Sequence, residues 1–395
     1  MGEDFRSQRQ LERLFPGGRL TQTAHGACFI LDQVYPAGHE HGRQRLGEVG
    51  ALPAAPAAAL DGDGRYERLA VRDFVYLDTE TTGLMGAGTL AFMVGVAYFE
   101  GDAFVARQYF LRDHGDEPAM LHLLAELLAG RAGLITFNGR CFDLPLLDNR
   151  YLLNRLDGLA ADWLARPHLD LLPPARRLWR SRVGSCSLAS LERNVLGLRR
   201  SGQDVPGWLI PSLYFDYLRS GDARPLAGVF YHNRLDLLSM VALTGQILGL
   251  LARPEAWDQP RDLVSLARWQ LALGLAAAAE ENLRLAAAQE LPLAQYQQAL
   301  RLLAGLLKRA GRRDEAVSLW QQLAVTSFDD VSAFVELAKD FEWRQRDPAA
   351  ARDWTLQAIA LLQRRRAANP FVLGELRHRL ARLEHKLAPA GQRQA

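Results

Sequence analysis

Two acids at the end of an apolar stretch could bind a cation. Residues 74–80 (Phe-Val-Tyr-Leu-Asp-Thr-Glu) run from β-favouring residues into Asp78 and Glu80, and a Thr-Thr-Gly turn follows. Side chains alternate along a strand, so the two carboxylates lie on the same side. Their mutual repulsion would be relieved by a divalent cation with oxygen ligands, such as Mg²⁺ or Mn²⁺. An isolated Asp-x-Glu fits better a strand end whose acids face water, because such short matches are frequent by chance.

Three more candidate residues follow along the chain. Asp143 comes five residues after Asn138 and stands where a helix is expected to begin. His232 and Asp236 are four residues apart, so on a helix they share one face. Taken singly, Asp143 fits a helix N-cap better than a metal ligand, and a pair such as His232 and Asp236 is commonly just a structural hydrogen-bonded pair. The combination with Asp78 and Glu80 favours a metal site.

The order of these motifs resembles the DEDD 3′–5′ exonuclease superfamily, which has a ribonuclease-H-like fold. The resemblance covers residues 73–245 and aligns the family's four acids with Asp78, Glu80, Asp143 and Asp236. It implies that these acids are catalytic and hold two divalent cations, and that His232 fills the fifth catalytic position in the His variant of the family. Residues 170–172 and 187–192 look similar to bacterial YprB-type proteins, predicted exonucleases of which some carry tetratricopeptide repeats.

This set of residues would suit hydrolysis of a phosphodiester. Two cations can activate a water and stabilise the leaving oxygen, and a neutral His232 would accept the proton of that water. The expected partner is nucleic acid, DNA or RNA, with a single-stranded end. Candidate contacts to the substrate are Thr79, Asn138 and Arg140, although Asn138 equally suits a turn. Two alternatives stay open: a structure-dependent endonuclease, and a non-catalytic adaptor that binds proteins.

The elements around these residues predict an α/β domain over residues 71–250. Strands are expected at 74–80, 89–99, 104–111, 133–137 and 168–171, and helices at 117–130, 144–154 and most of 175–250. This order indicates a ribonuclease-H-like mixed sheet flanked by helices. Residues 1–70 read as a partly ordered segment and linker with one strand at 27–31. His39 and His41 within it read as surface residues of a Gly-bounded loop.

The region 260–395 has a different character, rich in Ala, Leu, Arg and Gln with helical periodicity. Three pairs of residues recur 34 positions apart: Ala304 and Ala338, Ala316 and Ala350, and Trp320 and Trp354. That period is typical of tetratricopeptide helical hairpins. We therefore expect an all-α repeat domain with a surface for a protein partner.

Composition limits the other possibilities. The chain has 395 residues and a net charge of only +2, so it has no bulk electrostatic attraction to nucleic acid. Its three cysteines are far apart, which argues against a structural zinc site or disulfide framework and favours a reducing compartment. We expect no signal segment and no apolar stretch of membrane-spanning length. The sequence predicts a cytoplasmic protein without a membrane contact.

Overall fold

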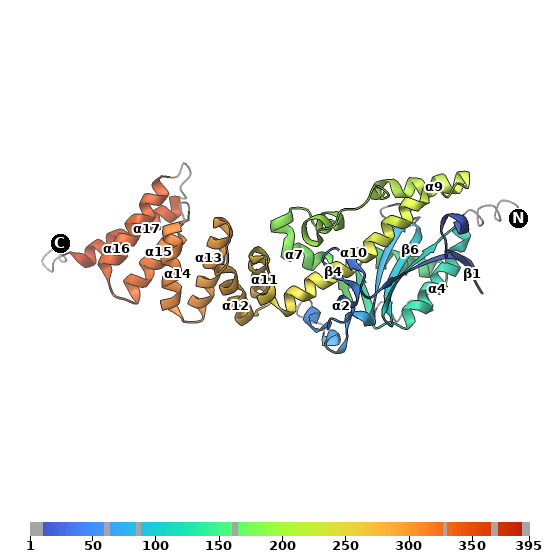
Figure 1. Cartoon of the computed structure of the whole chain (residues 1–395). Coiled ribbons are helices and arrows are strands. Elements are labelled where there is room, and N and C mark those ends of the chain that lie inside the picture. Colours follow the sequence, from blue (N-terminus) through green and yellow to red (C-terminus); the bar gives the residue numbers. More distant parts are fainter. Residues whose placement is uncertain are drawn as a thin grey trace. The chain divides into compact units, whose positions relative to one another are not determined.

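The computed structural model describes residues 11–58, 64–83, 88–159, 165–326, 330–364 and 370–388. The chain divides into two compact units, Met1–Arg253 and Pro254–Ala395 (Figure 1). A seven-stranded mixed sheet forms the centre of the first unit. In spatial order its strands are β1 (Arg19–Thr23), β2 (Gly26–Pro36), β7 (Ala103–Phe110), β6 (Ala91–Glu100), β5 (Phe74–Thr81), β8 (Gly133–Thr136) and β9 (His168–Asp170). The predicted mixed sheet is confirmed.

Strand direction brings three chain segments to one edge of the sheet. β5 pairs antiparallel with β6 but parallel with β8, and β8 pairs parallel with β9. The carboxyl ends of these three parallel strands therefore lie side by side. Asp78, the turn that follows Thr136, and Asp170 all belong to that edge.

Helices cover both faces of the sheet. The side chains of Gln108 and Tyr109 point to opposite faces because they are neighbours on β7. Tyr109 donates a hydrogen bond to the Leu123 carbonyl of α4 (Glu117–Ala129), and Gln108 donates to the Phe230 carbonyl of α10 (Leu226–Ala252). This explains why β6 is apolar on both faces, with only its last residue exposed.

The leading segment is part of the same sheet. β2 is eleven residues long, and it pairs with β7 from Phe29 opposite Phe110 to Pro36 opposite Ala103. The first unit therefore begins well before residue 71. Within the segment expected as a linker, the short helix η1 (Ala55–Ala57) packs near α10, and Ala57 is fully buried. Residues 59–63 of this segment lie outside the described residues.

The long helix α10 corrects one expectation. It is long and apolar enough to cross a membrane by length and composition alone, whereas we expected no such stretch. Of the apolar stretch in this helix, 72% is buried, and α10 packs along β5, β6 and β7. Burial against a sheet accounts for this composition. The other helices after β8 are α5 (Asp143–Leu153), α7 (Leu172–Val183), α8 (Leu188–Leu191), η5 (Glu192–Leu196), η6 (Gly207–Leu209) and α9 (Ile210–Ser220).

The second unit is all-helical, as predicted. Its helices are α11 (Pro260–Ala272), α12 (Ala276–Ala287), α13 (Leu293–Arg309), α14 (Arg313–Thr326), α15 (Ser332–Trp343), α16 (Pro348–Gln363) and α17 (Pro370–Leu387). Successive helices pack against each other. The 34-residue spacing maps α13 onto α15 and α14 onto α16, and Ala304 and Ala338 are both fully buried. The tetratricopeptide assignment itself stays a prediction.

Candidate active site

Four acidic side chains from three elements approach one another at the edge formed by β5, β8 and β9. Asp78 and Glu80 lie on β5, Asp143 is the first residue of α5, and Asp236 lies on α10. Burial raises the pKa of Asp78 well above its usual range, and the charges of Asp236, Glu80 and Asp143 raise it further. The fold thus brings together the four acids that the sequence singled out.

The other three acids are in similar electrostatic surroundings. Burial raises the pKa of Glu80, and the charges of Asp236 and Asp143 add to that effect. Burial also raises the pKa of Asp143 to about 6, although its carboxylate accepts a 2.5 Å hydrogen bond from the Thr79 hydroxyl. The pKa of Asp236 is raised by burial, and the charges of His232 and Arg200 oppose the rise. Without a cation, the site therefore favours the protonated forms of these carboxyl groups, and a bound cation would favour their ionised forms.

A relay of side-chain amides fixes α10 over β5. The buried Asn233 donates from Nδ2 to Asp78 Oδ2 at 2.8 Å, and its Oδ1 accepts from Gln108 Nε2 at 3.0 Å. Gly95 is the register partner of Asp78 on β6. A Cβ atom at Gly95 would lie 2.1 Å from Asn233 Oδ1, so this strand position requires glycine. The relay connects β7, α10 and β5 at the site.

His232 is held by an acid that the sequence analysis did not identify. Its Nδ1 lies 2.7 Å from Asp204 Oδ1, and its Nε2 lies 3.6 Å from Asp236 Oδ2. The Arg200 guanidinium, which can only donate, also lies 3.2 Å from Nδ1, so the two neighbours of this atom favour opposite tautomers. The contact to the carboxylate is the shorter one and favours the tautomer that carries its hydrogen on Nδ1. Nε2 is then the free acceptor on the side of Asp236, which is the form that a general base requires.

Arg200 is a second residue that the sequence analysis missed. Its guanidinium donates to both Glu192 carboxylate oxygens, at 2.6 and 2.7 Å, and also to Asp236. Glu192 in turn accepts a 2.7 Å hydrogen bond from Ser239, whose hydroxyl lies 3.0 Å from His41 Nε2. His41 is therefore buried behind the site, whereas we expected it at the surface, and burial lowers its pKa to about 4.

The turn after β8 is organised by Asp170. Its carboxylate accepts from the backbone N–H of Asn138 at 2.8 Å and of Arg140 at 3.1 Å, and Asn138 has a positive φ of 68°. The Arg140 guanidinium donates to the His168 carbonyl at 2.9 Å. Of the candidate substrate contacts, Thr79 and Arg140 thus already have protein partners, and Asn138 has the backbone conformation of a turn.

The donor set can be compared with the needs of a divalent cation. Within the described residues, no group of three or more His, Cys, Asp and Glu side chains is already arranged around one metal position. Arg200 and Asn233 are the present partners of Asp236 and Asp78. All four proposed ligands are nevertheless carboxylates whose pKa is raised by crowding and burial. Such a set of carboxyl oxygens fits Mg²⁺ or Mn²⁺, whose positive charge would stabilise the ionised forms.

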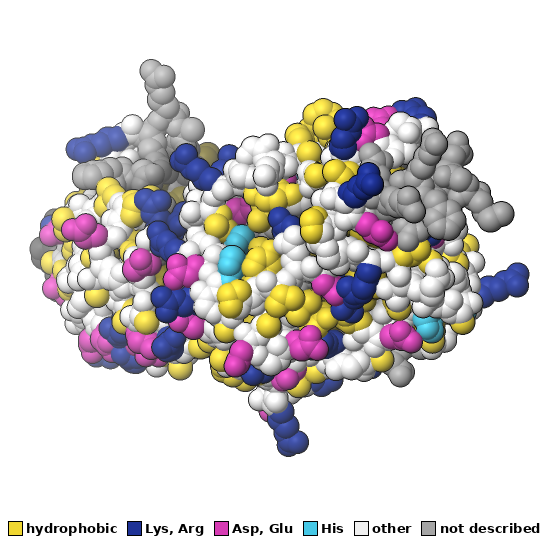
Figure 2. Space-filling model, turned by 45° about the vertical axis from the view of Figure 1, so that its right-hand side comes forward, with side chains coloured by type: hydrophobic (Ala, Val, Ile, Leu, Met, Phe, Trp, Pro, Cys, Tyr) yellow, Lys and Arg dark blue, Asp and Glu magenta, His cyan; other side chains and the backbone are white. Residues whose placement is uncertain are grey.

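Charges of both signs are mixed on one face of the molecule. On the face drawn in Figure 2, Lys and Arg side chains are interspersed with acidic and hydrophobic ones. This mixture agrees with the net charge of +2. Any attraction for a nucleic acid must come from local groups rather than from a field of one sign.

Comparisons with known proteins agree with this geometry. A family model described as the ribonuclease H superfamily matches residues 75–248, which include all four acids and His232. The Bacillus subtilis (strain 168) protein YprB, described as an uncharacterized protein, is 30% identical over 346 residues. That similarity covers 84% of this chain and 80% of YprB, so it extends over both units.

Proposed function

Because this chain belongs to the family of YprB and its residues 75–248 match the ribonuclease H superfamily, we propose that it is a metal-dependent nuclease, a 3′–5′ exonuclease of the DEDD type. One observation carries the proposal: Asp78, Glu80, Asp143 and Asp236 crowd together beside the Asp204–His232 pair. Two divalent cations, Mg²⁺ or Mn²⁺, would be held by the four carboxylates. When bound they would activate water and stabilise the leaving oxygen of a phosphodiester.

The chain's own residues supply the remaining steps. Asp204 keeps the hydrogen of His232 on Nδ1, so Nε2 can accept the proton of the attacking water. Asn233 orients Asp78 through the 2.8 Å hydrogen bond. Thr79 holds Asp143 in the same way at 2.5 Å. Asn138 and Arg140 lie on the turn after β8, where they would contact the strand that enters the site.

The proposed substrate is a single-stranded end of DNA or RNA. The second unit contributes none of the four acids, so its part would be binding, either of a protein partner or of the substrate. We also propose a cytoplasmic location, in keeping with three cysteines that are free thiols.

A second candidate function is favoured by one observation. The Arg200 guanidinium already neutralises Asp236, and it would have to release that carboxylate to a cation. A chain in which Arg200 keeps Asp236 would be a non-catalytic adaptor with a nuclease fold.

End-labelled single-stranded DNA and RNA, incubated with Mg²⁺ or Mn²⁺, test the proposal. We expect shortening from the 3′ end that stops with EDTA and in Asp78→Asn, because an amide is a poor replacement for a carboxylate ligand. Purified Asp78→Asn that cuts as fast as the wild type would refute the site. Internal fragments would instead indicate an endonuclease. Absence of both cleavage and calorimetric Mn²⁺ binding would indicate the adaptor.

A further inference from the structure

Trp208 on η6 is an exposed aromatic residue in the first unit. It is 80% exposed, more than any other large hydrophobic residue in the part of the chain that the structure describes. Single exposed hydrophobic residues are common on protein surfaces, so exposure alone assigns no role to Trp208. What distinguishes Trp208 is its place next to the candidate active site.

The segment that carries Trp208 lies against His232. Asp204, four residues before Trp208, contacts His232 Nδ1 through its Oδ1 at 2.7 Å. A Cβ atom at Gly207 would lie 3.9 Å from His232 Nε2. Trp208 is the next residue, and neighbouring Cα atoms are about 3.8 Å apart. The backbone of Trp208 is thus beside the nitrogen that is proposed to accept the proton of the attacking water.

Packing fixes this segment on both sides of Trp208. Before it, Val205 packs on α10 so closely that a Cβ atom at Gly228 would lie 2.4 Å from Val205 Cγ1. After it, Ile210 begins α9 and is almost completely buried. The exposed ring of Trp208 is therefore carried by a backbone that is anchored at its two ends.

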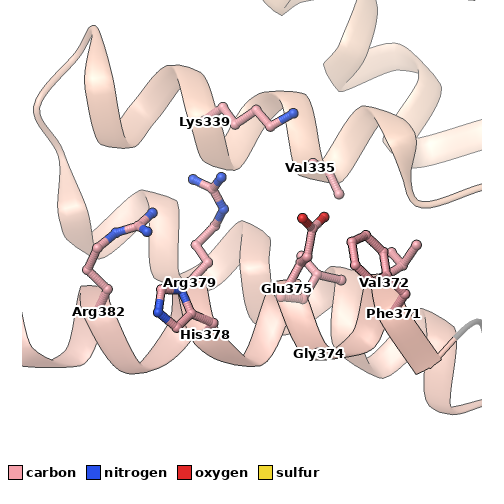
Figure 3. A pocket seen from close by; sticks show the side chains of 10 residues that line it. Val335, Lys339, Phe371, Val372, Gly374, Glu375, His378, Arg379 and Arg382 are labelled. Atoms are coloured by element: carbon pink, nitrogen blue, oxygen red, sulfur yellow. The ribbon is translucent and has the colours of Figure 1, made fainter.

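Trp343, at the end of α15 in the second unit, is the natural comparison. It is 62% exposed, but Arg382 and Lys386 lie over its ring, at 5.3 and 4.8 Å from the centroid. Arg382 also lines a pocket of about 610 Å³ between α15 and α17, and it donates to the buried Glu342 at 2.8 Å (Figure 3). Within the described residues, the ring of Trp208 has no cation and no second ring against it. Trp208 thus presents an uncovered planar face, whereas the ring of Trp343 is covered by cations.

An uncovered aromatic ring beside a site for phosphodiester cleavage suits a nucleobase. Every base has a planar face that stacks on an aromatic side chain, so the contact tolerates any sequence. A protein partner would need a broader apolar patch. Between Ser201 and Gly207, Pro206 is the one exposed apolar residue, so this segment offers a single ring rather than such a patch.

We propose that Trp208 stacks on the base at the 3′ end of the bound strand and so places the adjoining phosphodiester in front of His232 and the four acids. This assignment rests on the proposed nuclease function, and it adds a positioning residue that lies outside the acid motifs. Because the contact is to a base and not to the sugar, ends of DNA and of RNA should depend on Trp208 alike.

The test is the binding of a short fluorescent single strand to the full Asp78→Asn chain in Mn²⁺, a background that is expected not to cut. Trp208→Ala in this background should weaken binding about tenfold, the scale of one lost base contact. Trp208→Phe keeps a planar ring and should restore most of the binding. Trp343→Ala is the matched control, because it removes an exposed tryptophan whose ring is covered. It should leave the binding of the strand unchanged.

A strand that lacks its last bases at the 3′ end separates stacking from other effects of the substitution. Trp208→Ala should not weaken the binding of this abasic strand. The stacking is refuted if Trp208→Ala binds the ordinary strand as tightly as Trp343→Ala does, and Trp208 would then be a contact for a protein. It is also refuted if Trp208→Ala weakens the binding of both strands equally. A wild-type chain that never cuts would refute the proposed nuclease function, while a tenfold loss confined to the strand with its bases would still support the stacking.

Discussion

At the scale of single residues, the site depends on hydrogen-bonding partners as much as on its four acids. Asn233 joins Asp78 to Gln108, Thr79 holds Asp143, and Asp204 holds His232. These contacts orient groups whose own charges repel one another. Loss of one of these contacts should therefore lower the rate of cleavage even though the four acids and His232 are all still present.

Replacement of His232 by Ala should slow cleavage by roughly 10²–10⁴-fold, the usual scale for a lost general base. Metal affinity should change little, because the four proposed ligands remain. Calorimetric titration with Mn²⁺ next to single-turnover rates separates the two effects. A large loss of Mn²⁺ binding in a folded His232→Ala chain would make His232 a ligand instead.

Asp204→Asn should lower kcat and leave KM nearly unchanged, because Asp204 acts on His232 rather than on substrate. The measurement that decides is a double-mutant cycle. In the His232→Ala background the Asp204 change should have almost no further effect on the rate. If the rate reductions caused by the two single substitutions multiplied in the double variant, Asp204 would act independently of His232.

Gly95→Ala should reduce cleavage at least tenfold in a folded protein. The added methyl would stand 2.1 Å from Asn233 Oδ1, and Asn233 must then move away from Asp78. Asn233→Ala is the control background, since it removes the clashing amide. In that background, Gly95→Ala should lower the cleavage rate little further. An unchanged rate for Gly95→Ala alone would mean that the amide relay has no role.

The sequence predicted the acids better than their partners. Asp78, Glu80, Asp143 and Asp236 stand in recognisable spacings after strands or on a helix, and the fold gathers them. Asp204 and Arg200 lie in the irregular stretch before η6, where no periodicity indicates a direction for a side chain. Only the tertiary path of that stretch brings Asp204 to His232, so spacing alone could not identify the pair.

At the scale of elements, prediction succeeded where the hydrophobic residues of a segment follow one clear periodicity. β5, β7, α4 and α5 lie close to their expected ranges. β2 was expected as a short strand at 27–31, because its second half is polar and partly exposed. Pairing with β7 extends β2 to Pro36, because without β2 the backbone N–H and C=O groups on that side of β7 would have no partner strand.

The contact between α15 and α17 gives a prediction for acid conditions. Burial alone would raise the pKa of Glu342, but hydrogen bonds from Arg382 and Lys386 outweigh it and lower the pKa to about 2. The folded pKa lies below the ordinary value of 4.5, so the stabilisation is complete above about pH 4.5 and is lost as the pH falls towards 2. Its size is of the order of 3 kcal/mol.

Urea unfolding followed by circular dichroism between pH 6 and 2.5 measures this effect. Glu342→Gln should unfold at lower urea than the wild type at pH 6. The difference between the two proteins should shrink as the pH falls below 4.5. A constant difference across that range would show that the ion cluster does not stabilise the helix pair.

At the scale of the whole molecule, the division after Arg253 separates the proposed chemistry from the helical unit, whose proposed part is binding. A chain shortened to end at Arg253 keeps all of α10 and every proposed metal ligand. It should still hydrolyse a short single-stranded oligonucleotide, and it should lose the preference for longer strands. The measurement is kcat/KM on 6-mers and 30-mers. A soluble, metal-binding short chain that cannot cut the 6-mer would place part of the active site in the second unit.

The pairing of β2 with β7 has a consequence for how the protein folds. Phe29 and Phe110 face each other although they lie 81 positions apart in the sequence, so the hairpin of β1 and β2 pairs with a strand that is synthesised much later. In the second unit each helix packs mainly against its neighbour in sequence. Such local contacts form fast. We therefore expect the first unit to limit the folding rate. Its hairpin of β1 and β2 stays without its partner strand until β7 is made, so this segment is the most prone to aggregation during synthesis.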